Sequence, residues 1–91
     1  MNIPYDIKNV PMAGSIVNVK IEPEWNSCVV KMRETNVDLL IYDSAGSNYI
    51  TVTAGSSFAL SSHNFSASSS EDSIKLEAAS GTAEILGFKR D

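Results

Sequence analysis

Residues 37–54, VDLLIYDSAGSNYITVTA, decide the fold. Two short runs of apolar, β-branched and aromatic residues, 39–42 and 49–52, flank the polar segment 43–48. Gly46 in that segment accommodates positive φ, and the side chains of Asp43 and Asn48 can hydrogen-bond their own backbone, so we expect a turn there. The stretch therefore predicts a β-hairpin whose loop is longer than two residues.

Outward from this hairpin, apolar and polar residues alternate along most of the chain. The alternating segments are 15–22, 27–33, 73–78 and 82–89, and Phe58 and Leu60 form a shorter pair. Turn residues separate them every ~8–12 residues, as in antiparallel sandwiches and barrels. The sequence predicts an all-β fold, a small antiparallel β-sandwich or jelly-roll-like barrel of about eight short strands. Residues 1–91 form one domain.

Two of the predicted strands carry apolar residues on both faces. In 37–43, Val37, Leu39 and Ile41 share one face, and Leu40 and Tyr42 lie on the other. In 82–89, Ala83, Ile85 and Gly87 lie opposite Leu86 and Phe88, and Gly87 marks either a bulge or a close backbone approach. We expect the second faces, Leu40 with Tyr42 and Leu86 with Phe88, to be covered by another subunit.

The first twelve residues leave two interpretations open. Ile3, Tyr5 and Ile7 recur at every second position, and Pro4 and Pro11 restrict such a segment to an edge strand or an extended arm. As an edge strand it would complete the domain's own sheet. As an arm it would pack on a neighbouring subunit.

Composition excludes several classes of function. The chain has 91 residues and a formal net charge of −4, and its seven basic residues are scattered, which argues against binding nucleic acid. The single cysteine, Cys28, rules out an intramolecular disulfide and is expected to be buried. No apolar run approaches the ~20 residues that cross a bilayer, and the N-terminus lacks the pattern of a signal peptide. We expect synthesis in a reducing cytoplasm and no contact with a membrane.

The sequence gives no pattern typical of catalysis or of a cofactor. The single histidine, His63, lies in the serine-rich segment 61–72, which we expect to be a surface loop rather than the rigid element that a catalytic triad needs. Asp43, Ser44, Ser47 and Asn48 could offer oxygens to calcium, although turn geometry alone explains them. We expect no enzyme activity, no cofactor and no metal.

Two isolated aromatic residues are candidates for contacts. Trp25, in the predicted loop 24–26, could be a core residue, an interface anchor or a platform on which a carbohydrate stacks. Phe65 is the one aromatic residue in 61–72. With the residues above they make up the candidate interface: Ile3, Tyr5, Ile7, Trp25, Leu40, Tyr42, Phe65, Leu86 and Phe88.

Residues 37–91 resemble small accessory proteins of tailed-bacteriophage virions. The resemblance rests on DLLIYDSAGSNYITVTAGSSFAL, with its D-x-x-G hairpin and T-A-G-S turn, and on the closing strand in SIKLEAASGTAEILGFKRD. It implies a structural protein located in the virion and made in the host cytoplasm. Its role would be head decoration (cement) on the major capsid protein, or a tail or connector component, with homo-oligomers expected. The alternatives are a small carbohydrate- or receptor-binding β-domain of a tail or fibre, and a cytoplasmic interaction module.

Overall fold

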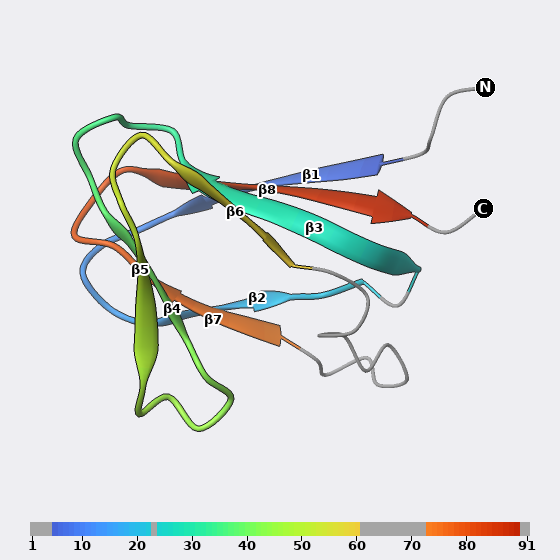
Figure 1. The fold of residues 1–91 in the computed structure, drawn as a ribbon, viewed down its shortest axis with the longest axis horizontal. Coiled ribbons are helices and arrows are strands. Elements are labelled where there is room, and N and C mark those ends of the chain that lie inside the picture. The colour runs from blue at the N-terminus through green and yellow to red at the C-terminus, as the bar shows by residue number, and fades with distance from the viewer. Residues whose placement is uncertain (1–4, 23, 61–72, 90–91) are drawn as a thin grey trace.

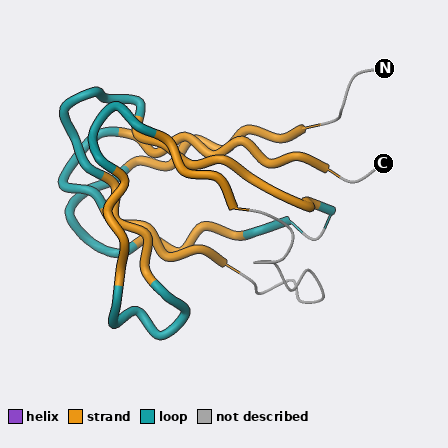
Figure 2. Tube along the Cα trace, in the orientation of Figure 1, coloured by secondary structure: helices purple, strands orange, loops and turns teal. Residues whose placement is uncertain are grey.

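The computed structural model describes residues 5–22, 24–60 and 73–89, and these residues form an all-β fold (Figures 1 and 2). The eight strands are β1 (Tyr5–Pro11), β2 (Val17–Lys20), β3 (Trp25–Met32), β4 (Leu39–Tyr42), β5 (Tyr49–Val52), β6 (Ser57–Leu60), β7 (Ser73–Glu77) and β8 (Thr82–Lys89). The predicted fold class is confirmed as a sandwich rather than a closed barrel. Ile3, Phe65, His63 and the predicted loop 61–72 lie outside the described residues.

The strands form two four-stranded antiparallel sheets (Figure 1). Sheet A has the order β1-β8-β3-β6, and sheet B has the order β2-β7-β4-β5. Among the described strands, β4 and β5 are the one pair consecutive in sequence that also pair in a sheet; they form the predicted hairpin, in which Ile41 lies opposite Ile50. Elsewhere the chain alternates between the layers, so strands distant in sequence become neighbours in each sheet.

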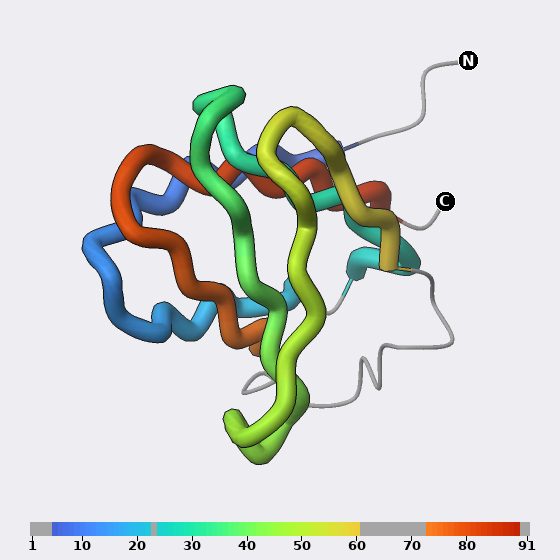
Figure 3. Tube along the Cα trace, turned by 60° about the vertical axis from the view of Figure 1, so that its left-hand side comes forward, coloured from blue at the N-terminus to red at the C-terminus, as the bar shows by residue number. Residues whose placement is uncertain are grey.

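The tip of the β4–β5 hairpin projects beyond the other strands of the sandwich (Figure 3). Gly46 has φ of 75°, as the turn required. Asp43 accepts a hydrogen bond from the Ser47 backbone N–H at 3.1 Å, and the Asp43 N–H donates to the Asn48 carbonyl at 2.9 Å. Both bonds hold the turn, and the bond that the carboxylate accepts from the Ser47 N–H lowers the pKa of Asp43.

The core lies between the inner faces of the two sheets. The expected burial of Cys28 is confirmed, and the alternation in its strand also buries Val30 and Met32 on β3, as it does Leu39 and Ile41 on β4. Successive side chains of a strand point to opposite faces of the sheet. When one set faces the core, the residues between them lie on the outer face of the sheet. The buried hydrophobic residues are Met12, Val19, Ile21, Trp25, Cys28, Val30, Met32, Leu39, Ile41, Val52, Ile74, Leu76, Ala78, Ala83 and Ile85.

Of the two interpretations of the N-terminal segment, the described residues support the edge strand. From Tyr5 to Pro11, β1 pairs along its whole length with β8, and it has one neighbour because it is the first strand of sheet A. Tyr5 and Ile7 lie on the outer face and are 59% and 62% exposed. β1 is therefore an integral strand of the domain.

Truncating Ile41 tests the assignment of the hairpin to the core. Ile41 is 8% exposed, so Ile41→Ala should lower the free energy of unfolding by about 2–5 kcal/mol. The free energy of unfolding of a domain of this size is about 5 kcal/mol in total, so the variant should be largely unfolded at low urea concentrations. Urea titration followed by Trp25 fluorescence measures the change. Ile50→Ala is the matched control because Ile50, opposite Ile41, is 47% exposed, and an equal loss in both variants would contradict the assignment.

Candidate functional site

The outer face of sheet A carries an apolar row that crosses all four strands. The pairing registers align Ile7 of β1 with Leu86 of β8, Leu86 with Val29 of β3, and Val29 with Ala59 of β6. In the next row toward the end of β8, Tyr5 lies opposite Phe88. We define the outer apolar face as Tyr5, Ile7, Val29, Ala59, Leu86 and Phe88. The pairing registers place all six on the face of sheet A opposite the buried side chains of β3 and β8, so the alternation that builds the core leaves this set outside.

A cluster of two basic side chains and one acidic side chain borders the outer apolar face on one side. Glu84 accepts hydrogen bonds from Lys31 Nζ and from Arg33 Nε, each at 2.9 Å. The bond from Lys31, followed by that from Arg33, lowers the pKa of Glu84. A shallow hollow of about 260 Å³ lies beside this cluster, lined by Ile7, Val29, Lys31, Glu84, Ile85 and Leu86. This surface suits the docking of apolar side chains.

The outer face of sheet B is different in chemistry. Tyr42 donates its hydroxyl to Glu77 Oε1 at 2.7 Å, and this bond raises the pKa of the phenol. Beside it, Lys75 Nζ donates to Asn18 Oδ1 at 3.0 Å. Leu40 and Tyr42 are half-buried on a surface of paired polar groups, so the second apolar face predicted for this strand is smaller than that of sheet A.

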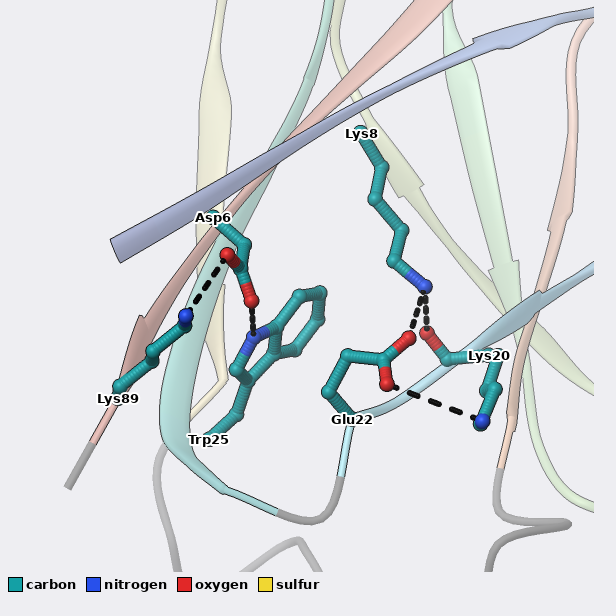
Figure 4. Close-up of polar contacts among 6 residues, drawn as sticks. All are labelled: Asp6, Lys8, Lys20, Glu22, Trp25 and Lys89. Carbon is teal, nitrogen blue, oxygen red and sulfur yellow. Dashed lines mark hydrogen bonds and ion pairs between the residues drawn. The ribbon is translucent and has the colours of Figure 1, made fainter. Parts of the chain in front are cut away.

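Trp25 is not an exposed interface residue, and its placement corrects two expectations. It begins β3 rather than lying in a loop, with a shift of pairing register between Trp25 and Ser27. Its side chain is 0% exposed, which supports the core alternative and removes both the interface and the carbohydrate-platform alternatives. Figure 4 shows its Nε1 donating to Asp6 Oδ2, at 2.9 Å. Gly87 of β8 lies against the ring, so the close approach that we expected at this glycine is confirmed.

Charged side chains join the two layers along the side formed by β1 and β2 (Figure 4). Lys8 of β1 donates to Glu22 Oε2 at 2.7 Å and to the Lys20 carbonyl at 3.0 Å. Its ammonium also lies 5.4 Å from the centre of the Trp25 ring, a cation–π distance. Lys89 pairs with Asp6 at 3.2 Å. Inward-pointing Asp6 and Lys8 thus protect the β1 edge of the sandwich from pairing with another chain.

Stability should fall in acid because several carboxylates are better hydrogen-bonded in the folded state. The bond from Trp25 lowers the pKa of Asp6, the bond from Lys8 lowers that of Glu22, and the bond from Lys31 lowers that of Glu84. A lowered folded-state pKa gives stability that is complete above the ordinary pKa, near pH 4, and that is lost as pH falls through the folded-state value. The urea midpoint should therefore be constant above about pH 6 and should fall below about pH 4. Glu84→Gln should flatten that fall, and a midpoint independent of pH would contradict the assignment.

Two other side chains that could take part in chemistry, Cys28 and Asp43, have structural roles instead. Cys28 is fully buried, and burial raises the pKa of its thiol to about 11, so little reactive thiolate forms at neutral pH. Asp43, the main candidate for calcium, uses both carboxylate oxygens within its own turn, toward the Ser47 N–H and the Asn48 amide. Among the described residues, no three or more His, Cys, Asp or Glu side chains gather as a metal site would require.

The structure brings only part of the candidate interface together. Tyr5, Ile7, Leu86 and Phe88 share the outer apolar face, whereas Leu40 and Tyr42 lie on the opposite sheet. Sequence reasoning missed Val29 and Ala59. Val29 shares a strand face with Lys31 and Arg33, and such a face is expected to be solvated. Knowing that Val29 pairs with Leu86 would have revealed that it belongs to an apolar surface.

In the part of the chain that the structure describes, no helix is long and apolar enough to cross a membrane. No protein-family model matches the chain, and no curated protein matches it significantly, so the outer apolar face of a β-sandwich is the feature on which a functional assignment depends.

Proposed function

We propose that this protein is a non-catalytic structural protein of a tailed-phage virion, a decoration or cement protein. It binds the major capsid protein through the outer apolar face of sheet A and stabilises the head. The observation that supports this proposal most is that Ile7, 62% exposed, continues an apolar row across the whole sheet, with Tyr5, 59% exposed, beside it in the next row. Large apolar side chains gathered on one exposed surface are typical of a binding site.

The size of this face suits one contact among many on a repeating shell. Four strands about 4.8 Å apart and about five residues of ~3.3 Å rise give a flat area of roughly 300 Å². A standard interface buries about 800 Å² per partner, so each contact should be weak. On a capsid lattice, weak contacts are reinforced when one assembly binds several sites at once. Lys31, Arg33 and Glu84 add a polar border of two basic groups and one acidic group, so this border carries one excess positive charge.

The resemblance of residues 37–91 to small phage accessory proteins supports the same proposal. The protein would be made in the host cytoplasm and located in the virion, with the major capsid protein as its partner. A domain whose single cysteine is buried needs no oxidising compartment to fold.

Mass spectrometry of purified virions tests this proposal. Particles banded in a density gradient should contain the chain in a fixed, high copy number relative to the major capsid protein, and stripping it should lower the temperature at which heads lose their DNA. Absence of the chain from purified particles that carry a full set of head proteins would overturn the proposal. Recovery only in tails would move it to the tail or connector role.

A carbohydrate- or receptor-binding role has one specific observation in its favour. Tyr42 and Tyr49 lie with ring centres 5.2 Å apart, beside the polar turn that contains Asp43 and Asn48. A glycan array probed with the labelled protein distinguishes the two functions. Glycan binding that is lost in Tyr49→Ala would favour this second role, whereas the decoration role predicts no selective glycan binding.

A further inference from the structure

The two lateral sides of the sandwich are built differently. Charged residues join the layers on the side of β1 and β2, as described above. On the opposite side, the edge strands β5 and β6 have the sequences YITV and SFAL. Neither contains a charged residue or a proline. Natural edge strands usually carry such residues because they prevent pairing with another chain.

Within residues 5–22, 24–60 and 73–89, the backbone of β5 has unpaired groups at two positions. The Asp43 N–H donates to the Asn48 carbonyl, which makes those residues a hydrogen-bonded pair at the end of the hairpin. Hydrogen-bonded and non-hydrogen-bonded pairs alternate along an antiparallel ladder. Tyr42/Tyr49 and Leu40/Thr51 are therefore non-hydrogen-bonded pairs, and the backbone N–H and C=O groups of Tyr49 and Thr51 point away from β4.

Apolar side chains accompany this free edge. Tyr49 is 56% exposed, Ile50 47% and Phe58 37%. They contribute to a hollow of about 350 Å³ between the two sheets, lined by Ile41, Tyr42, Asp43, Asn48, Tyr49, Ile50, Phe58 and Leu60. Figure 3 shows β5 beside β4, with the chain leading from β5 into β6, and β5 is the last strand of sheet B. The edge thus offers both backbone partners and apolar contacts, as strand addition requires.

We propose that β5 pairs antiparallel with β5 of a second copy of this chain, about a twofold axis at Ile50. In this register the backbone of Tyr49 exchanges both N–H···O=C hydrogen bonds with the partner's Thr51, and Thr51 does so with the partner's Tyr49. Ile50 then faces the partner's Ile50 in a close, non-hydrogen-bonded pair. Sheet B becomes continuous across the two copies.

The absence of charge on β5 and the area that pairing would bury both favour a second copy of this chain as the partner of the β5 edge. A twofold interface must be complementary to itself, and the uncharged β5 opposes no like charges although the chain carries −4. Three half-exposed apolar side chains at ~100 Å² each, with the strand edge, bury roughly 400 Å² per copy. The total of about 800 Å² is at the lower limit of specific interfaces, so the dimer should be weak and concentration-dependent. This surface is separate from the outer apolar face, and the inference does not depend on the proposed function.

A cysteine cross-link tests the register. Residues facing each other in a non-hydrogen-bonded pair have Cα atoms about 4.5 Å apart, within the range of a disulfide. Ile50→Cys should form a covalent dimer when it is oxidised at concentrations where the protein dimerises. Native Cys28 should not interfere because it is fully buried. Asn18→Cys is the matched control, since Asn18 is exposed on β2, the other edge of the same sheet, and should stay monomeric.

Sedimentation equilibrium tests the dimer without a new thiol. Between about 10 µM and 1 mM the native chain should shift from monomer to dimer. Thr51→Pro removes an edge N–H that β4 does not use and should abolish the dimer, whereas Thr51→Val should retain it. The Trp25 emission spectrum checks that each variant is folded. A native chain that stays monomeric throughout, or equal cross-linking of the Ile50→Cys and Asn18→Cys variants, would overturn the proposal.

Discussion

Replacing Gly87 by alanine should lower the free energy of unfolding by about 3 kcal/mol or more, enough to leave much of the protein unfolded. A Cβ on Gly87 would lie well inside van der Waals contact with Cε2 and Cδ2 of Trp25. The indole cannot move aside, since it is fully buried and its Nε1 is hydrogen-bonded to Asp6 of β1. Urea titration followed by far-ultraviolet circular dichroism measures the loss.

Two variants separate this clash from other effects of the substitution. Gly55→Ala serves as control: no atom lies within 4 Å of the added carbon, and only its φ of 85° is unfavourable, at a cost of about 1 kcal/mol. In a Trp25→Leu background the six-membered ring is absent, so Gly87→Ala should cost much less than in the native chain. Additive costs of Trp25→Leu and Gly87→Ala would contradict a direct contact between the two residues.

Replacing Ile7 by aspartate should weaken the proposed binding to the virion shell by about 30-fold or more while leaving the fold intact. Ile7 is 62% exposed and lies next to Leu86 in the apolar row. A carboxylate there would have to be desolvated when the outer apolar face is covered. The fold should tolerate it because the residue already faces solvent. Co-sedimentation of the purified protein with heads stripped of the native chain gives the affinity.

Asn9→Asp is the matched control for this variant. Asn9 is exposed on the same face of β1, two residues beyond Ile7, and lies opposite Glu84 at the polar border. The two variants add the same charge to the same strand, so electrostatic repulsion alone would weaken binding equally in both. Only an apolar contact at Ile7 predicts a large difference between them. Equal affinities for the two variants would exclude the outer apolar face as the binding surface.

Most of the fold could be predicted from the alternation of apolar and polar residues within single strands. In β3, β4, β7 and β8 the buried apolar residues recur at every second position, as the alternation in the sequence indicates, because a half-buried strand separates its two faces by position alone. The hairpin and its glycine turn were equally accessible, since both depend on residues close in sequence. These features require no knowledge of which strand lies beside which.

Trp25 shows what local reasoning could not supply. Pro23, Glu24 and Asn26 around it have the composition of a loop, yet the ring is buried because Gly87, sixty-two residues later, leaves room for it and Asp6 accepts its N–H. The outer apolar face has the same origin. Tyr5 with Ile7, and Leu86 with Phe88, were each placed on a common face from sequence, but only the pairing of β1 with β8 makes them one surface.

The position of β8 also governs when the protein can acquire its structure during synthesis. β8 is the last of the eight strands, and it lies inside sheet A between β1 and β3. Residues 82–89 must therefore leave the ribosome before β1 and β3 can pair with the strand that lies between them. Until then, sheet A is incomplete, and its apolar side chains and unpaired strand edges are exposed. Closing such long loops makes β-sandwich folding slow, commonly milliseconds to seconds. Translation thus delivers a chain that folds in one late step, and nascent copies crowded on one message would be at their most vulnerable to aggregation before that step.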